Sequence, residues 1–242
     1  MKAIVLSAGY GTRLGELTRE IPKPMLSIAG KPLLEYMLGY LRHNNFDEIA
    51  INLHYKPELI QNYFGDGAAW GVKIYYAYEE NLLGTAGAVR NFASFLGDTE
   101  DFLVIYGDLL LDQDLALLQQ VHREKRAIAT LLVHQRLNSN SLIKMDEDNR
   151  IVAFLERPSE EEKKATPYPW VNSVVQMLNR RILHYIPEHQ PSDLPRDIYM
   201  SIISRERLYG VPLTSYRCAI DSPIRYEEAQ QAVLSRKCKV FL

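Results

Sequence analysis

The sequence predicts an α/β fold with a mixed, mainly parallel sheet and a small antiparallel addition. Two observations support this prediction. In the first half of the chain, short apolar runs typical of buried strands alternate with segments whose apolar residues have helical spacing, which favours parallel strands joined by helices. Between residues 128 and 155, three apolar runs follow one another with no helical segment between them, which indicates antiparallel strands.

The composition predicts one domain, residues 1–242, because 242 residues with 47% apolar side chains can build one large core. A formal net charge of -2 gives no general attraction to nucleic acid or to an anionic membrane, so we expect local recognition of a small anion. Two cysteines outside any C-x-x-C spacing indicate neither a disulfide framework nor a zinc site. No signal-peptide pattern or long apolar run is found, which predicts a cytoplasmic protein.

The segment that follows the first predicted strand has the composition of a phosphate-binding loop. The apolar run of residues 3–6 leads into Gly9 and Gly11, which allow backbone conformations that other residues resist. Arg13 offers a planar set of donors for phosphate oxygens, and Lys23 lies between two prolines that stiffen its approach. Because the dinucleotide fingerprint and the P-loop motif are both missing, neither a dehydrogenase nor a P-loop enzyme is favoured.

The remaining elements follow from periodicity and from turn residues. The nucleotide half, about residues 1–112, is expected to contain helices 33–41 and 57–64, strands 49–53, 72–78 and 102–106, and a helix that begins within residues 84–88. The sugar half, about residues 113–242, is expected to contain helices 114–124, 180–186, 194–204 and 224–236, and strands 128–133, 142–145, 151–155, 170–178, 211–216 and 217–220. The charged run 159–164 is interpreted as a solvated loop, and residues 187–195 as a mobile one that borders the substrate.

Asp108 is the candidate metal ligand that follows from the chain itself, because it emerges where the strand 102–106 leaves the core. Carboxylate oxygens suit Mg²⁺, which binds proteins through one or two carboxylates and keeps its other positions for water and substrate phosphates. The alternative is an aspartate that caps the following helix, and this alternative fits Asp112 or Asp114 better than Asp108.

Several motifs occur together in one order. They are G-x-G-T-R at residues 9–13 with Pro22-Lys23, L-G-T-A-G-A at 83–88, Gly107-Asp108, Glu156-Arg157-Pro158, Val171-Asn172-Ser173 and Asp221. In this order the chain resembles the sugar-phosphate nucleotidyltransferases, or NDP-sugar pyrophosphorylases, and is most similar to mannose-1-phosphate or heptose-1-phosphate guanylyltransferases. The resemblance implies a Rossmann-like three-layer fold of the nucleotide-diphospho-sugar transferase type. It also implies transfer of a nucleoside monophosphate from an NTP to a sugar 1-phosphate, with release of pyrophosphate.

The resemblance assigns a role to each motif residue. It implies catalytic roles for Arg13 and Lys23, and Mg²⁺ binding by Asp108 and Asp221. The implied nucleotide-binding residues are Leu6, Ala8, Gly9, Gly11, Thr12, Glu79, Gly84 and Thr85, and the implied sugar-phosphate-binding residues are Glu156, Arg157 and Asn172.

Alternatives stay open at several of these positions. The segment 83–88 could instead be a small-residue helix that packs tightly on the sheet. Asn172 could have its hydrogen bonds satisfied within the sheet. Asp221 could cap a helix that has Pro223 in its first turn. The chain departs from the family pattern at Arg157, where the family has lysine, at Val174, where it has glycine, and at Ser222, where the glycine and threonine of the family pattern D-[IV]-G-T-P are missing. These departures keep a non-catalytic sugar-nucleotide-binding homologue as an alternative.

The nucleobase is predicted from the end of the strand 72–78. Guanine presents two adjacent donors that one carboxylate can accept together, and Glu79 or Glu80 could supply that carboxylate. With the segment 83–88, this favours GTP, and the resemblance then implies a mannose- or heptose-type 1-phosphate. A uridylyl- or thymidylyltransferase acting on another hexose 1-phosphate is the alternative. The expected partners are therefore the NTP and the sugar phosphate, without nucleic acid or membrane, and the chain could also form a homo-oligomer.

Overall fold

The computed structural model describes residues 1–136, 139–166 and 168–242. The chain forms two compact units, each assembled from separate stretches of sequence. Unit 1 contains residues 1–82, 105–114 and 214–242, and unit 2 contains residues 83–104 and 115–213. Strand β6 (Asp101–Tyr106) passes from one unit into the other, so its first four residues belong to unit 2 and its last two to unit 1.

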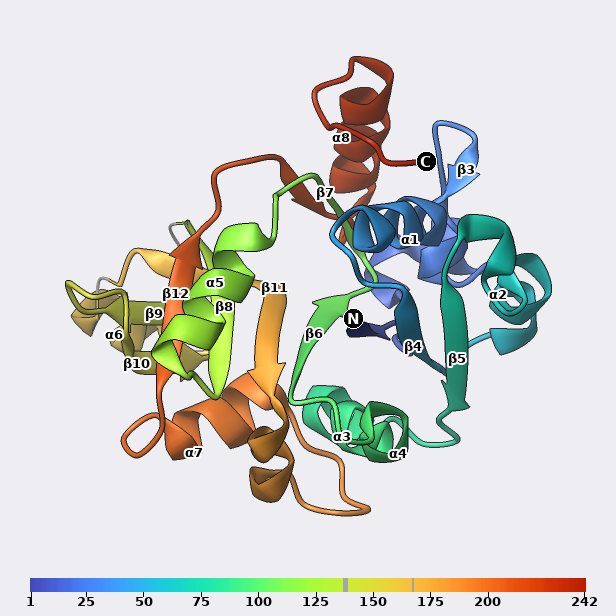
Figure 1. Cartoon of the computed structure of the whole chain (residues 1–242). Helices are drawn as coiled ribbons and strands as arrows, with labels where there is room; N and C mark the ends of the chain where they lie inside the picture. Colours follow the sequence, from blue (N-terminus) through green and yellow to red (C-terminus); the bar gives the residue numbers. More distant parts are fainter. Residues whose placement is uncertain (137–138, 167) are drawn as a thin grey trace. The chain divides into compact units, whose positions relative to one another are not determined.

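Unit 1 contains a parallel sheet built from the apolar runs predicted as strands. Its strands are β1 (Lys2–Leu6), β4 (Glu48–Leu53), β5 (Lys73–Tyr78) and the end of β6, in the order β6-β1-β4-β5 (Figure 1). Ala3 pairs with Ile49, which in turn pairs with Ile74, and all three side chains are buried. Because β1, β4 and β5 are parallel, their carboxyl ends share one edge, where ligands of α/β sheets bind.

The helices of unit 1 begin and end close to the predicted residues. They are α1 (Leu33–His43), α2 (Pro57–Phe64) and α8 (Pro223–Leu234), with 3-10 helices at Thr12–Thr18, Lys23–Met25 and Ala68–Trp70. Two small antiparallel sheets complete the unit, β2 (Ser27–Ile28) with β3 (Lys31–Pro32), and β7 (Leu109–Leu111) with β13 (Arg217–Ala219). Leu14, Tyr36, Leu110 and Ile220 share one apolar cluster, which joins the glycine loop, α1 and the β7–β13 pair.

Unit 2 contains the antiparallel addition that the sequence predicts. Its strands are β8 (Ala129–Gln135), β9 (Ser141–Met145), β10 (Ile151–Glu156), β11 (Trp170–Asn179) and β12 (Leu208–Pro212). Strands β9 and β10 form the predicted antiparallel pair, β11 runs antiparallel to β8, and β12 runs parallel to β8. The predicted fold class, a mixed α/β fold with parallel strands and an antiparallel addition, is therefore confirmed.

The helical elements of unit 2 are shorter and less regular. They are α3 (Gly84–Asn91), α4 (Ala93–Leu96), α5 (Ala116–Lys125), α6 (Glu160–Ala165), a 3-10 helix at Arg180–Tyr185, a π-helix at Leu194–Tyr199 and α7 (Met200–Ile202). None of the helices within the described residues combines the length and the apolar character that crossing a membrane would take.

Two local predictions were wrong. The charged run 159–164 is largely helical, because Ser159 and Glu162 form a capping box in which each side chain accepts a hydrogen bond from the other's backbone N–H. The helix expected at residues 114–124 begins at Ala116, its N-cap is Leu115, and no side chain makes a capping hydrogen bond. Neither Asp112 nor Asp114 is therefore the cap of this helix.

Candidate functional site

The glycine loop follows β1 and turns at Gly11. Gly11 lies in the left-handed region at φ 69°, and a Cβ there would lie 3.2 Å from the Cγ2 of Thr18, so the turn favours glycine. Thr18 fixes the turn by donating from its hydroxyl to the Gly11 carbonyl oxygen at 3.0 Å. The expectation that Gly9 adopts a backbone conformation other residues resist was wrong, because its φ is not positive and nothing lies within 4 Å of its Cβ position. Gly15, at φ 57°, is the second left-handed residue of this segment.

Lys23 and Asp108, which are 85 residues apart in the chain, form an ion pair. The distance from Lys23 Nζ to Asp108 Oδ2 is 2.7 Å, and the two side chains are 14% and 26% exposed. Pro22 is extended and Lys23 begins a short 3-10 helix, so the prolines on either side fix the backbone from which the ammonium group extends. The structure therefore brings together the residue predicted to contact phosphate and the residue predicted to bind metal.

Asp221 lies next to Asp108 because β7 and β13 pair. Ala219 is the partner of Leu109, and the Ile220 N–H donates to the Asp108 carbonyl oxygen at 2.9 Å. The alternative role of Asp221 as a helix cap was wrong, since Ser222 is the N-cap of α8 and accepts from the Arg225 N–H at 3.3 Å. Helix capping, the structural role that the sequence offered for Asp221, therefore does not account for its carboxyl group.

Asp112 has a structural role instead of a capping one. Its carboxylate accepts from the backbone N–H of Tyr216 at 2.8 Å and from that of Lys239 at 2.8 Å. It thereby ties the residues around β13 and the C-terminal segment to β7. This assignment separates Asp112 from Asp108, although both follow the same strand β6.

The carboxylates of Asp108 and Asp221 fit a magnesium ion as a donor set. Within residues 1–136, 139–166 and 168–242, no three histidine, cysteine, aspartate or glutamate side chains are arranged to hold a metal. Two carboxylates without a third protein ligand match Mg²⁺, which takes its remaining ligands from water and substrate phosphates. The neighbouring Ser7 hydroxyl is buried without a hydrogen-bond partner among the described residues, which is a further polar atom available at this edge.

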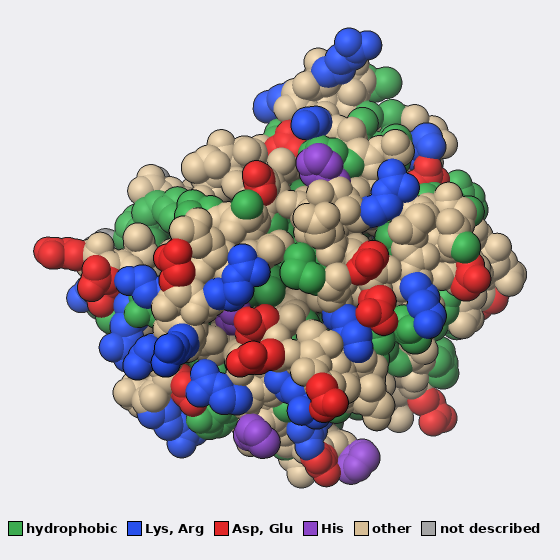
Figure 2. Space-filling view, in the orientation of Figure 1, with side chains coloured by type: hydrophobic (Ala, Val, Ile, Leu, Met, Phe, Trp, Pro, Cys, Tyr) green, Lys and Arg blue, Asp and Glu red, His purple; other side chains and the backbone are tan. Residues whose placement is uncertain are grey.

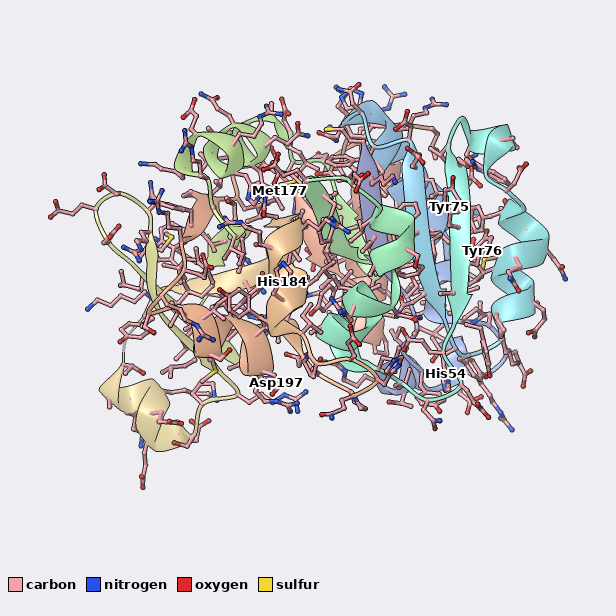
Figure 3. All side chains as sticks on the ribbon, turned by 60° about the horizontal axis from the view of Figure 1, so that its bottom comes forward. His54, Tyr75, Tyr76, Met177, His184 and Asp197 are labelled. Carbon is pink, nitrogen blue, oxygen red and sulfur yellow. The ribbon has the colours of Figure 1, made fainter. Side chains whose placement is uncertain are left out.

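A second polar cluster lies at the carboxyl ends of β4 and β5. Asn52 accepts from the Ser7 N–H at 2.7 Å and donates to Glu79 Oε1 at 2.8 Å, and Glu79 is only 3% exposed. His54, which Figure 3 shows beyond the ends of these strands, has its Nδ1 2.7 Å from the Glu79 carbonyl oxygen. Because a carbonyl only accepts, Nδ1 carries a proton, and in the neutral ring Nε2 then accepts from the Tyr10 hydroxyl.

The small residues at 84–87 make room for the chain's own backbone. Gly84 is left-handed at φ 72°, and a Cβ there would collide with the Ser192 carbonyl oxygen, which accepts from the Ala86 N–H at 2.9 Å. The Thr85 hydroxyl donates to Asp193 Oδ2 at 2.9 Å and accepts from the Leu194 N–H at 2.8 Å. This geometry supports the alternative in which the segment packs tightly, and nucleotide binding by Gly84 and Thr85 stays a prediction.

Glu156 ends β10 as a partly buried carboxyl. Burial, followed by the negative charge of Asp193, raises the pKa of Glu156 to about 7, although Arg157 opposes the shift. Arg157 itself is exposed and lies in the left-handed region at φ 53°. A residue before proline avoids the helical region, but the left-handed region is costly for arginine as well. The side chains predicted to hold the sugar phosphate therefore stand on a strained turn.

Asn172 lies at an irregularity in β11. The register of β11 against β8 shifts between Asn172 and Gln176, and Asn172 Oδ1 accepts from the Val174 N–H at 2.8 Å. Val174 is left-handed at φ 57°, an uncommon conformation for a β-branched residue. The Asn172 amide nitrogen donates no hydrogen bond among the described residues, so the alternative of an asparagine fully satisfied in the sheet holds only for its oxygen.

The comparisons with known proteins agree with the motifs. The model of the family described as nucleotidyl transferase matches residues 2–211. The chain belongs to the nucleotidyl transferase family. A UTP--glucose-1-phosphate uridylyltransferase of Synechocystis sp. is 35% identical over 99% of this chain and 65% of its own length. A D-glycero-alpha-D-manno-heptose 1-phosphate guanylyltransferase of Aneurinibacillus thermoaerophilus is 30% identical over 96% of this chain and 97% of its own length.

A solved structure supports the fold of this chain. A UDP-glucose pyrophosphorylase in complex with UDP-glucose has a TM-score of 0.83 at 20% identity, and the match covers 97% of this chain and 98% of the other. Sequence coverage varies more among the relatives, since the chain spans 65%, 59% and 52% of the lengths of three curated proteins that it matches.

Sequence reasoning missed several polar residues of the candidate site. Asn52 holds Glu79, and Asp193 both orders the segment 84–87 and acts on Glu156. Asn52 could have been noticed as the one polar residue in the apolar run of residues 49–53. The sequence carries no comparable signal for Asp193, because its partners Thr85 and Glu156 lie 108 and 37 residues away in the chain.

Proposed function

We propose that the protein transfers a nucleoside monophosphate from an NTP to a sugar 1-phosphate and releases pyrophosphate. The observation that carries this proposal is the ion pair between Lys23 and Asp108, with Asp221 beside it across the β7–β13 pair. A cation and two carboxylates beyond the end of a parallel sheet suit in-line attack on a phosphorus atom, which needs positioning and neutralisation of charge. Family membership supports the same reaction class.

The residues of unit 1 act on the triphosphate. The backbone amides of the glycine loop, with Leu6, Ala8, Gly9, Gly11 and Thr12, face the phosphates, and the exposed Arg13 offers them a planar set of donors. Lys23 neutralises charge at the reacting phosphate, because its ammonium can exchange the Asp108 carboxylate for a phosphate oxygen. A bound Mg²⁺, held by Asp108 and Asp221, would neutralise and orient phosphate oxygens.

The residues of unit 2 bind the sugar phosphate. In its neutral form the Glu156 carboxyl can both donate to and accept from sugar hydroxyls, and Arg157 can pair with the 1-phosphate in a bidentate manner. The amide nitrogen of Asn172 donates to a sugar hydroxyl. In this proposal one nucleotidyltransferase domain, residues 1–242, has a nucleotide half of about residues 1–112 and a sugar half of about residues 113–242.

The favoured substrates are GTP and a mannose- or heptose-type 1-phosphate. The buried Glu79 carboxylate, fixed by Asn52, can accept the two adjacent donors of guanine. The heptose 1-phosphate guanylyltransferase supports this choice, because the match covers 97% of its length. UTP with glucose 1-phosphate is the second candidate, because the uridylyltransferase is 35% identical to the chain.

A substrate panel tests the proposal. The full chain is incubated with Mg²⁺, each of the NTPs and several sugar 1-phosphates, and pyrophosphate release is measured. Release that requires Mg²⁺, an NTP and a sugar phosphate together supports the reaction, and preference for GTP supports the base assignment. Equal or better use of UTP or dTTP removes the guanine assignment. Nucleotide binding without any pyrophosphate release removes the enzymatic proposal and leaves a non-catalytic binding protein.

A further inference from the structure

A cleft of about 700 Å³ lies in unit 2 among residues that none of the motifs includes. Its lining comes from the start of β6, the last turn of α5, the end of β11 and the turn before β12. The cationic side chains of this lining are Arg123, Arg126, Arg181, Arg205 and Arg207. We call this cavity the arginine cleft. Figure 2 shows lysine and arginine side chains gathered over the region where α5 and β12 lie in Figure 1.

The arginine cleft lies at the end of the unit 2 sheet away from Asn172. Asn179 ends β11, pairs through its neighbour Leu178 with Ala129 at the start of β8, and lines the cleft. Asn172 lies seven residues earlier on the same strand, opposite Val133 near the other end of β8. At about 3.3 Å per strand residue, the cleft and Asn172 are up to about 23 Å apart. The cleft is therefore separate from the proposed sugar-phosphate site.

The floor of the cleft is a buried polar network. His122 is 1% exposed, with Nδ1 2.9 Å from Thr130 Oγ1 and Nε2 3.2 Å from Asp101 Oδ1. Asn179 donates from Nδ2 to the same Asp101 oxygen at 2.8 Å. Burial alone would raise the pKa of Asp101, but the hydrogen bonds from His122 and Asn179 outweigh burial and lower the pKa. The carboxylate of Asp101 is thus hydrogen-bonded to His122 and Asn179 at the floor of the cleft.

Three of the arginines are positioned by contacts with neighbouring groups. Arg181 donates from Nε to Asn179 Oδ1 at 3.0 Å, and Arg207 donates from Nη1 to the Lys125 carbonyl oxygen at 3.3 Å. The Arg205 guanidinium lies over the Tyr185 ring at 5.0 Å from its centroid. The lining also contains the carboxyl groups of Glu100, Asp101 and Glu206, and the Tyr185 hydroxyl donates to Glu206 Oε1 at 2.6 Å.

The five cleft arginines make no ion pair with a carboxylate among the described residues. The arginines that do pair lie elsewhere, at Arg19, Arg90, Arg196 and Arg225. Favourable interaction with the carboxyl end of α5 can explain Arg123 and Arg126, which lie in or just after its last turn. It does not explain Arg181, Arg205 and Arg207, which come from other elements and converge on the same cleft.

We propose that the arginine cleft is a second anion-binding site, which takes a small phosphorylated metabolite with at least two phosphate groups. Guanidinium groups bind phosphate oxygens in a bidentate manner, and several of them spread over one cleft suit separated phosphates. A volume of about 700 Å³ is within the range of small-molecule sites. A small ligand is favoured over nucleic acid because the chain carries a net charge of -2.

Hydrogen exchange of the full chain with inorganic tripolyphosphate, without Mg²⁺, tests the proposal. Tripolyphosphate can also bind the glycine loop, so the two sites are followed separately. Protection of residues 119–127, 179–185 and 204–209 reports the arginine cleft, and protection of residues 9–25 reports the loop. We expect protection of the cleft segments to saturate and to weaken as salt increases. Protection confined to residues 9–25 would overturn the proposal and leave the proposed function intact.

The double variant Arg123→Gln/Arg205→Gln locates the binding. Arg205 lies over the Tyr185 ring and the charge of Arg123 acts on Asp101, so circular dichroism and thermal unfolding check that both substitutions leave the fold intact. The affinity measured at the cleft should fall about tenfold for each lost charge-assisted bond, and protection of residues 9–25 should persist. Arg123→Lys/Arg205→Lys keeps both charges but loses the planar forks, so its affinity should lie between those of the wild type and the glutamine variant.

A charge-matched control is Lys164→Gln/Arg236→Gln, which removes two exposed cations outside the cleft. An equal loss of affinity in this control would show a general charge effect and would overturn the proposal. A single-stranded oligonucleotide at the same phosphate concentration is the last arm. If it protects the cleft segments and tripolyphosphate does not, the surface binds nucleic acid and the small-ligand proposal is wrong.

Discussion

The proposed nucleotide and sugar regions differ in which residues carry left-handed backbone. In the glycine loop of unit 1 these residues are Gly11 and Gly15, at φ 69° and 57°. In the sugar region of unit 2 they are Arg157 and Val174, at φ 53° and 57°. Glycine adopts this conformation without steric cost, whereas other residues pay for it. Strain at a non-glycine residue persists only where surrounding contacts impose it, and such residues gather at functional sites.

The two regions also treat their carboxyl groups differently. Asp108 is paired with the Lys23 ammonium group at 2.7 Å. Burial, followed by the negative charge of Asp193, raises the pKa of Glu156 to about 7, so a large share of this carboxyl is neutral near neutral pH. The comparison suggests that the nucleotide region uses full charges on a relaxed backbone. The sugar region uses a neutral hydrogen-bonding carboxyl on a strained one.

The largest predicted effect is a loss of turnover on substitution of Asp108 in the proposed nucleotide region. Asp108→Asn keeps the size of the side chain but removes the charge that is proposed to bind Mg²⁺, so turnover should fall at least about 10²–10³-fold. Pyrophosphate release measures the loss, and circular dichroism checks the fold. Asp112→Asn is the matched control, because Asp112 follows the same strand and only holds the backbone of Tyr216 and Lys239. Turnover at the wild-type rate in Asp108→Asn would contradict the metal assignment.

The next effect concerns Glu156, whose pKa rises from an ordinary 4.5 to about 7 in the folded chain. A raised pKa means that the folded state binds the proton more tightly than the unfolded state does. The stabilisation that comes from protonated Glu156 is therefore complete below about pH 4.5 and is lost as the pH rises through about 7. Glu156→Gln removes this dependence.

After allowance for solvent screening of this partly exposed group, the Glu156→Gln variant should gain, relative to wild type, free energy of unfolding on the order of 1 kcal/mol between these two limits. Urea unfolding at several pH values measures the gain, and the exposed Glu161→Gln provides the control. A constant difference between the variant and the wild type across this range would show that Glu156 is an ordinary surface carboxylate.

The sequence predicted the regular elements of unit 1 well, because their signals are local. The run 49–53 became β4, residues 57–64 became α2 with the predicted limits, and α1 begins at Leu33 as predicted. The pairing of Lys23 with Asp108 could be anticipated only through the motif order, since each residue type alone has many other uses.

The sequence failed where competing local signals or distant partners decide the structure. Residues 159–164 have charges typical of a solvated loop, but the Ser159–Glu162 capping box makes them helical. Ser222 and Asp221 are both good N-caps, and only the backbone geometry selects Ser222. The small residues of 84–87 match ligand approach and close packing equally well, and the Ser192 backbone that occupies this space is 108 residues beyond Gly84.

Val174→Gly tests whether the left-handed backbone at residue 174 of the proposed sugar region is strained, because glycine adopts this conformation without steric cost. Relief of the left-handed cost should roughly offset the extra chain entropy of glycine and the lost contacts of the half-buried valine, for a net change in unfolding free energy close to zero. Thermal or urea unfolding measures it. Val152→Gly is the matched control, because Val152 is an exposed strand valine without positive φ, and it should destabilise by about 1 kcal/mol. Destabilisation of similar size in both variants would mean that Val174 is not strained.

The final effect separates the neighbours Asp221 and Ser222. Ser222 caps α8, so Ser222→Ala should cost about 1 kcal/mol of unfolding free energy and leave pyrophosphate release nearly unchanged. Asp221→Asn should do the reverse, because Asp221 makes no cap and is proposed to bind Mg²⁺. Measuring both unfolding and turnover for both variants resolves two adjacent residues that the sequence alone leaves interchangeable. If Asp221→Asn lowers stability and spares turnover, then the second carboxylate belongs to the helix and Asp108 binds the metal without it.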